Sequence, residues 1–242
     1  MITVFANPKG GVGKSLLSFN YAIYQQLKEK EVIVVDLDAQ HSILKFQKIR
    51  SLNSQLKPLN IKIFDEDSES LLAFLDSIDN EEVVIDTGGF DSEINRYCVA
   101  SADKIIVPIS DSPVELMRLV DFNDILSEIE SSLKSENVDK EIIGNVLFNR
   151  VHPSLRNVND IVTDFSDMSN LKFLTSMVRD RARIKNLISS GMSALEEKGN
   201  NKDERAINDL QVAFQEIDKL WTRKSRSKNY TLGENKMKQE LV

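Results

Sequence analysis

A glycine-rich stretch near the N-terminus constrains this chain more than any other feature. Residues 7–15 read NPKGGVGKS and lie between an apolar run at residues 2–6 and an amphipathic run at residues 16–27. This order predicts a buried strand, a tight turn and a helix, which is the setting of a phosphate-binding loop. The glycines of such a loop let the backbone approach the phosphates, and its N–H groups and the positive helix end point at them.

Two side chains of the loop suit a bound nucleotide. Lys14 would neutralise the β- and γ-phosphates, and the Ser15 hydroxyl would bind Mg²⁺. The chain departs from the general G-x-x-x-x-G-K-[ST] pattern at Pro8, where glycine is expected, and carries a second lysine, Lys9, before the paired glycines. A glycine-rich turn that binds nothing is the alternative interpretation, and the flanking strand and helix disfavour it.

Length and composition narrow the class of protein. The 242 residues suffice for one α/β domain, and 41% hydrophobic and 29% charged residues are typical of a soluble globular protein. The net charge of −7 excludes a uniformly basic nucleic-acid binder, so any DNA contact needs a local basic patch. Cys98 is the only cysteine, which excludes an internal disulfide. Without a leader or an apolar run of bilayer length, we expect a cytoplasmic protein.

Apolar and amphipathic runs alternate along the chain. We expect strands at residues 2–6, 32–36, 61–64, 83–86, 104–108 and 142–148, with an extended segment at 172–178. Helices are expected between them and at residues 158–165, 182–190 and 206–220, and Ser42 is the expected N-cap of a helix over residues 43–50. The pattern predicts an α/β fold with a doubly wound, mostly parallel sheet and helices on both faces. Residues 1–221 would form one domain and residues 222–242 a mobile basic tail.

Polar residues stand where several predicted strands end. Asp36 and Asp38 lie at the end of the second strand, and Asp86 ends the fourth. Asn149 and Arg150 follow the sixth. Ligands bind outside the carboxyl ends of the strands in a doubly wound sheet, so these side chains and the glycine-rich loop would meet at one edge. Any one carboxylate could instead cap a helix, but several strand ends converging on a phosphate loop favour a site.

The loop in its K-G-G-x-G-K-[ST] form resembles the deviant Walker A loop of the ParA/MinD/nitrogenase-iron-protein superfamily. Residues 36–40, DLDAQ, resemble the D-x-D-P-Q segment of ParA-type ATPases, with Ala39 in place of the usual proline. Residues 83–89 resemble their Walker B strand, with Gly88 and Gly89 where many members have prolines. Residues 179–196, with Gly191 and Glu196, are loosely similar to their C-terminal region. The resemblance spans about residues 1–200 and indicates a ParA-type partition ATPase.

The resemblance implies a role in ATP hydrolysis for each matched residue. Asp38 would orient the attacking water, and Asp36 would act nearer the metal. Asp86 would hold Mg²⁺ through water, together with the Ser15 hydroxyl. The phosphates would be bound by one contiguous set of residues: Lys9, Gly10, Gly11, Val12, Gly13, Lys14, Ser15 and Leu16.

The resemblance also implies an ATP-dependent homodimer. Lys9 would reach across the dimer to the partner's ATP phosphates, so that Lys9, Lys14 and Asp38 are the expected catalytic residues. ATP hydrolysis would then dissolve the dimer. Asn149, with Arg150 beside it, would read the adenine, because a side-chain amide can both donate to and accept from the base edge.

ParA relatives bind DNA non-specifically as ATP dimers, and a centromere-binding or adaptor partner stimulates their release. The resemblance therefore implies nucleoid association in the ATP state. Residues 222–242 hold six Lys or Arg against two Glu, and a second basic cluster precedes them. The alternative for residues 222–242 is a solvated tail that only keeps the protein soluble. The candidate phosphate contacts are Arg179, Arg181, Arg183, Lys185, Arg223, Lys224, Arg226 and Lys228.

Three other classes of protein share the loop. A MinD-like membrane ATPase needs a C-terminal amphipathic helix, and residues 228–242 show no apolar stripe, so no stable membrane association is expected. A redox ATPase of the nitrogenase type needs a cysteine pair in each subunit to bridge a cluster, and Cys98 is single. A non-hydrolysing nucleotide-binding scaffold is disfavoured because the catalytic and metal-binding positions are intact: Lys9, Lys14, Ser15, Asp38 and Asp86.

Overall fold

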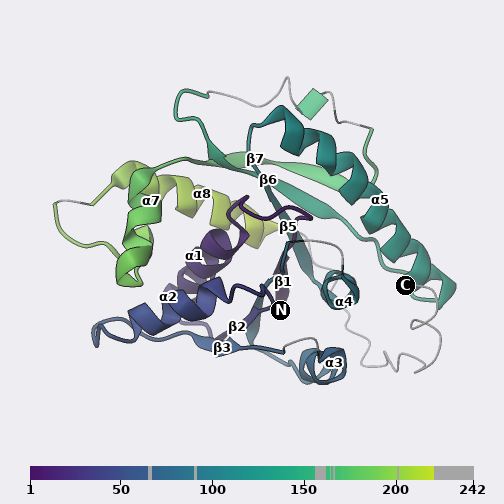
Figure 1. The fold of residues 1–242 in the computed structure, drawn as a ribbon, viewed down its shortest axis with the longest axis horizontal. Coiled ribbons are helices and arrows are strands. Elements are labelled where there is room, and N and C mark those ends of the chain that lie inside the picture. Colours follow the sequence, from purple (N-terminus) through teal and green to yellow (C-terminus); the bar gives the residue numbers. More distant parts are fainter. Residues whose placement is uncertain are drawn as a thin grey trace.

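The computed structural model describes residues 1–64, 67–89, 92–155, 162–163, 165, 167–200 and 202–220. These residues form a seven-stranded sheet in which all neighbouring strands are parallel, in the order β3-β2-β4-β1-β5-β6-β7 (Figure 1). The doubly wound α/β fold expected from the sequence is confirmed. The expected tail at residues 222–242 and most of the expected helix at 158–165 lie outside the described residues.

The elements follow the predicted alternation. The strands are β1 (Ile2–Phe5), β2 (Val32–Asp36), β3 (Asn60–Lys62), β4 (Glu82–Asp86), β5 (Lys104–Ile109), β6 (Gly144–Val151) and β7 (Leu171–Arg179). The helices are α1 (Lys14–Leu27), α2 (Ser42–Arg50), α3 (Ser68–Asp76), α4 (Glu93–Ser101), α5 (Pro113–Ser135), α7 (Ala182–Leu187) and α8 (Glu204–Lys219). Two 3₁₀ turns, Ile188–Ser190 and Ala194–Glu196, follow α7.

The sheet is covered on both faces, which explains why its central strands are apolar throughout. Along β1, Ile2 and Val4 face a core built with α3, α4 and α5, whereas Phe5 faces a second core built with α1, α2, α7 and α8. The two groups of helices lie on opposite sides of the strands in Figure 1. Residues alternate between the two cores because successive strand side chains point to opposite faces.

One strand differs from the expectation in a way that affects the site. The sequence predicts a strand ending at Phe148, but β6 continues through Asn149 and Arg150 to Val151, because it pairs with β7 up to Arg179. Asn149 and Arg150 are therefore part of the strand. Among the described residues, no helix combines the length and apolarity needed to cross a bilayer.

Candidate nucleotide site

Three loops meet at the carboxyl ends of β1, β2 and β4, which are neighbours in the sheet. A Cβ built on Gly89 would lie 3.0 Å from the Gly10 nitrogen, so the loop after β4 packs directly on the phosphate loop. A Cβ on Gly88 would lie 3.4 Å from the Leu37 carbonyl oxygen, so the same loop also contacts the segment after β2. The absence of a side chain at Gly89 permits the close packing on Gly10, and the ends of β1, β2 and β4 converge as predicted.

The phosphate loop holds Lys14 in a fixed position. Its Nζ donates to the backbone carbonyls of Lys9 at 2.8 Å and Asn7 at 3.1 Å, and the residue is only 4% exposed. Burial lowers the pKa of Lys14, and the nearby carboxylates of Asp86 and Asp38 oppose that shift. The ammonium group is thus kept within the loop, where an anion would meet it.

Asp86 lies at the bottom of the site and fits a magnesium ion. Its Oδ1 accepts a hydrogen bond from the Ser18 hydroxyl at 3.0 Å, and no partner is found for its buried Oδ2 within the described part of the chain. Burial raises the pKa of Asp86 to about 7, and the neighbouring Ser15 hydroxyl opposes this shift. A divalent cation would satisfy the free oxygen and stabilise the charged form. Ser18 was not predicted, although it lies one helical turn after Lys14.

Asp36 is opposite Asp86 in the β2–β4 register, but its oxygens are occupied. Oδ1 accepts from the Asp38 N–H at 3.3 Å and Oδ2 from the Leu44 N–H at 3.0 Å. Burial raises its pKa, and these backbone hydrogen bonds oppose the shift. Asp36 therefore holds the segment after β2 and the start of α2. No group of three or more His, Cys, Asp or Glu suited to a metal occurs in the described residues.

Asp38 stands at the rim of the same site. Its Oδ1 accepts a hydrogen bond from the Gln40 N–H at 2.8 Å, and the residue is only partly buried. Its own N–H donates to Asp36, which fixes the backbone at this position. The Asp38 Oδ2 has no hydrogen-bond partner in the part of the chain that the structure describes, and a carboxylate held in this way is able to orient a water molecule.

Lys9, unlike Lys14, has an acidic side-chain partner. Its Nζ lies 2.8 Å from Oε1 of Glu115, in the first turn of α5. The other carboxylate oxygen accepts hydrogen bonds from the Ser110 N–H at 2.9 Å and the Ser110 hydroxyl at 2.7 Å. Burial alone would raise the pKa of Glu115, but the bonds from Lys9 and Ser110 outweigh it and lower the pKa. The sequence offered no signal for Glu115, which lies 106 positions from Lys9.

Asn149 and Arg150 contact the phosphate loop. Asn149 Nδ2 donates to the Val12 carbonyl oxygen at 2.8 Å, and Arg150 Nη1 donates to the Gly11 carbonyl oxygen at 2.6 Å. Both side chains thus direct donors at the loop backbone. The predicted contact of Asn149 and Arg150 with adenine is not tested by this geometry.

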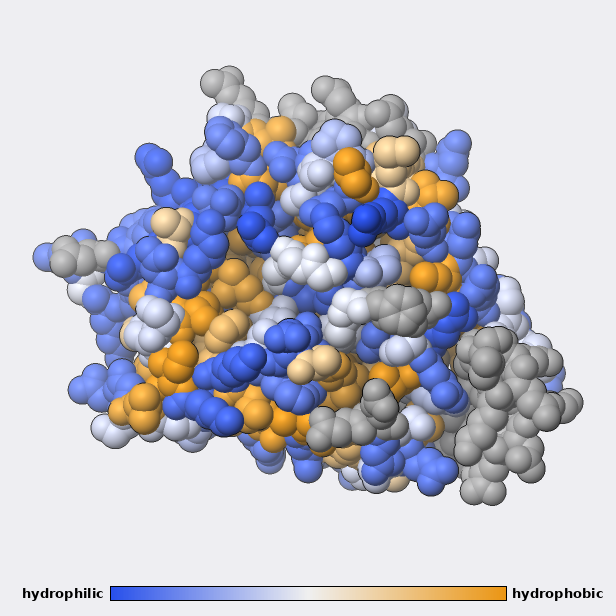
Figure 2. Space-filling model, viewed as in Figure 1, coloured by the Kyte–Doolittle hydropathy of each residue, from blue (hydrophilic) through white to orange (hydrophobic). Residues whose placement is uncertain are grey.

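The predicted basic cluster at residues 179–185 forms two kinds of ion pair: two arginines share one carboxylate, and two other basic residues each have a carboxylate of their own. Arg179 and Arg181 share one carboxylate, that of Asp209, at 3.1 and 2.6 Å. Arg183 pairs with Glu197, and Lys185 pairs with Asp180 at 2.7 Å. Figure 2 shows mainly hydrophilic side chains over α7, which follows Arg181. The other candidates, Arg223, Lys224, Arg226 and Lys228, lie outside the described residues.

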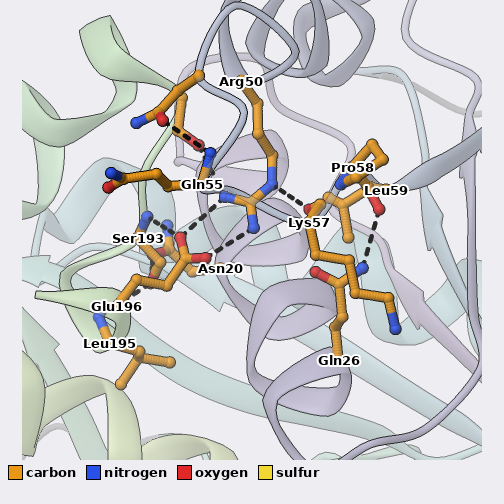
Figure 3. A network of polar contacts seen from close by, with 12 residues as sticks. Asn20, Gln26, Arg50, Gln55, Lys57, Pro58, Leu59, Ser193, Leu195 and Glu196 are labelled. Carbon is orange, nitrogen blue, oxygen red and sulfur yellow. Dashed lines mark hydrogen bonds and ion pairs between the residues drawn. The ribbon is translucent and has the colours of Figure 1, made fainter.

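The two residues of the loosely matched C-terminal region, Gly191 and Glu196, both contact the buried Arg50. Figure 3 shows the Glu196 carboxylate facing the Arg50 guanidinium. Glu196 binds Arg50 through both carboxylate oxygens, at 2.6 and 2.8 Å, and Arg50 is fully buried. The Gly191 carbonyl accepts a further bond from Arg50 at 2.9 Å. A Cβ on Gly191, whose φ is 66°, would lie 2.4 Å from the Arg50 Cα. These residues attach the end of α2 to the segment after α7.

The fold and the loop define a nucleotide-binding protein with a phosphate loop at the edge of a parallel sheet. Within that class, the chain belongs to the CobQ/CobB/MinD/ParA nucleotide binding domain family, whose model matches residues 3–194. The ParA/MinD members of this family are nucleotide-binding ATPases. A comparison with curated proteins finds no match.

Several solved structures are similar to this chain in fold. One is a protein of Borrelia burgdorferi B31 ascribed to plasmid partition and bound to AMPPNP (TM-score 0.62, 16% identity, covering 89% of this chain and 99% of that one). Another is an ATP complex of a McdA variant from Cyanothece (TM-score 0.62, 17% identity, 88% and 96% covered). A third is the MinD cell division protein of Aquifex aeolicus (TM-score 0.56, 13% identity, 88% and 96% covered). At these identities the likeness establishes the fold.

Proposed function

We propose that this protein is a ParA-type ATPase that dimerises on ATP, binds DNA non-specifically in that state and partitions plasmid, chromosomal or other cargo. The observation that carries the proposal is the meeting of three strand-end loops around Lys14 and Asp86, with Lys9 at the margin. The solved ATP and AMPPNP complexes of proteins with the same fold support the choice of nucleotide.

The site residues would act by positioning and by neutralising charge, which is what phosphoryl transfer requires. Lys14 and the loop N–H groups would bind the β- and γ-phosphates. Asp86 and the Ser15 hydroxyl would hold Mg²⁺, which neutralises phosphate charge when bound. Asp38 would orient the attacking water. Asp36 would keep Asp38 in place, because the Asp36 carboxylate accepts a hydrogen bond from the Asp38 backbone N–H.

Lys9 would couple nucleotide state to association. Its side chain is one-third exposed and pairs with Glu115 within the same subunit. In the ATP state Lys9 would leave Glu115 and bind the phosphates of a second copy, so hydrolysis would remove the charge that holds the two copies together. A partner protein that stimulates hydrolysis would then control release.

The DNA contacts would come from a groove between the end of β7 and the start of α8. The charged residues that line this groove are three arginines and two carboxylates: Arg179, Arg181, Arg205, Glu204 and Asp209. Arg179 and Arg181 share the Asp209 carboxylate, which leaves N–H donors free, and the three arginines of the groove outnumber its two carboxylates by one. Arg183 and Lys185 are each matched by a carboxylate of their own and would contribute less.

A gel-shift assay with ATP, ADP or no nucleotide at several salt concentrations tests the proposal. We expect DNA binding with ATP only, for unrelated duplex sequences alike, and with log affinity falling linearly against log salt. Arg205→Ala should weaken DNA binding and reduce the slope of log affinity against log salt by about one. Lys185→Ala should change the affinity and the slope less. Sedimentation with liposomes is the parallel arm: ATP-dependent membrane binding without DNA binding would favour the MinD-like alternative and refute partition through DNA.

A further inference from the structure

Two adjacent residues of β6 hold two consecutive carbonyls of the phosphate loop. Asn149 contacts the Val12 oxygen and Arg150 contacts the Gly11 oxygen, at 2.8 and 2.6 Å. Asn149 is 2% exposed, and its Nδ2 lies 2.5 Å from the place that a Cβ on Gly13 would occupy. Gly13 is therefore the residue that leaves room for the Asn149 amide beside the loop.

These contacts orient the loop N–H groups. In a trans peptide unit the C=O and the following N–H point in opposite directions, and the described chain has no cis peptide bond. The carbonyls of Gly11 and Val12 point to donors on β6, so the N–H groups of Val12 and Gly13 point away from those donors. Within the described residues neither N–H has a hydrogen-bond partner, and both are available to an anion.

The backbone of β6 is distorted where this contact is made. Arg150 has a φ of 58°, in the left-handed region that a residue with a Cβ rarely adopts. The pairing of β6 with β7 shifts register between Asn149 and Val151, so Arg150 lies at an irregularity of the strand. Irregularities of this kind redirect side chains and are concentrated at functional sites. Here the distortion coincides with the contact of Arg150 on the Gly11 carbonyl.

We propose that Asn149 and Arg150 are positioning residues for the phosphates, which keep the peptide units of residues 11–13 in the orientation that receives an anion. Their effect on binding is then exerted through the loop, at the phosphate end of the nucleotide, and is independent of the base. This inference rests on the nucleotide binding proposed above and assigns to Asn149 a different role from reading the adenine.

Calorimetric titration with three probes in the presence of Mg²⁺ separates the two roles. The probes are ATP, GTP and inorganic tripolyphosphate, which has no base. Asn149→Ala and Arg150→Ala should each weaken the binding of all three probes by a similar factor. We expect about tenfold, for the loss of one well-formed hydrogen bond to the loop. The ratio of ATP to GTP affinity should stay unchanged, and Arg150→Lys, which keeps a donor, should bind tripolyphosphate more tightly than Arg150→Ala.

Asn145→Ala is the matched control, because Asn145 lies on the same strand and its amide donates to Ile105, away from the loop. It should bind tripolyphosphate as the unmodified protein does. Arg150 is exposed, so the Arg150 variants keep the test valid if Asn149→Ala does not fold. Loss of ATP affinity alone, with tripolyphosphate binding unchanged, would overturn the proposal in favour of adenine reading, and so would unchanged binding of all probes. Failure of the unmodified protein to bind any probe would refute the proposed nucleotide function itself.

Discussion

Lys9 and Lys14 belong to the same loop but have different surroundings. Lys14 is buried and bound by two backbone carbonyls, which offer no competing charge. Lys9 is one-third exposed and bound by the carboxylate of Glu115, which an incoming phosphate can replace. The loop thus carries one cation that stays in place and one that can be released.

Removing the charge of Glu115 should therefore favour the proposed dimer. Glu115→Gln keeps the shape of the side chain and its contact with Ser110, but no longer holds the Lys9 ammonium as an ion pair. Because a partly exposed pair contributes up to about 1 kcal/mol, we expect half-maximal dimerisation at about fivefold lower ATP concentration. Sedimentation velocity over an ATP series measures this, with Lys9→Ala as the variant that should not dimerise. An unchanged or weaker dimer in Glu115→Gln would contradict the idea that Glu115 competes with the phosphates of the second copy for Lys9.

Substitutions at Lys14 and Asp38 should affect ATP binding and ATP turnover differently. Lys14→Ala removes the cation at the phosphates, so Mg·ATP affinity should fall by about a hundredfold or more. Asp38→Ala leaves the loop intact, so ATP should still bind while the turnover rate falls by about 10² to 10³. Calorimetry for binding and phosphate release for turnover distinguish the two effects. Normal turnover by Asp38→Ala would refute its role in orienting water.

At the level of elements, the start of α2 shows what the sequence could not predict. Ser42 was the expected N-cap, but the helix begins at Ser42 itself, and His41 before it has a φ of 46° and makes no side-chain cap. The Leu44 N–H is bound by Asp36, at the end of β2. The strand and the helix were predictable from periodicity, whereas a cap supplied from eight residues away depends on how the two elements meet.

The end of α2 depends on the buried Arg50–Glu196 pair. Glu196→Gln would leave the Arg50 guanidinium buried without a charged partner, which we expect to lower the free energy of unfolding by about 3 kcal/mol. Urea denaturation at neutral pH measures the loss. Glu197→Gln is the matched control, because Glu197 pairs with a much more exposed arginine, Arg183. The free energy of unfolding should fall less in Glu197→Gln than in Glu196→Gln. Equal losses in the two variants would contradict a special role for burial.

At the scale of the whole molecule, the sequence predicted the sheet but not the contacts between distant segments. The apolar runs indicated strands buried on both faces, and glycines and carboxylates at strand ends indicated the site. The extension of β6 to Val151 depends on pairing with β7, and the Lys9–Glu115 pair depends on where α5 begins relative to β1. Neither arrangement leaves a local pattern in the sequence.

The last helix is fastened to the first by one carboxylate. Asp218, near the end of α8, accepts hydrogen bonds from Tyr21 at 3.0 Å and Gln25 at 2.6 Å, both on α1, and from Lys28, the C-cap residue of α1, at 2.5 Å. Its backbone oxygen accepts from the buried Lys104 on β5 at 3.1 Å. Burial alone would raise the pKa of Asp218, but the three side-chain donors outweigh it and lower the pKa. The folded protein therefore favours the charged carboxylate more than the unfolded chain does.

The stability of the whole domain should accordingly depend on pH through Asp218. A carboxylate with a lowered folded-state pKa stabilises the fold above its unfolded value, 3.8, and loses this effect as pH falls through the folded value. Asp218→Asn should cost about 1–3 kcal/mol at pH 7, because buried donors on α1 lose a charged acceptor. Urea denaturation of both proteins between pH 7 and pH 3 should show this difference narrowing below about pH 4. A difference that stays constant over the whole range would mean that the carboxylate acts by shape alone.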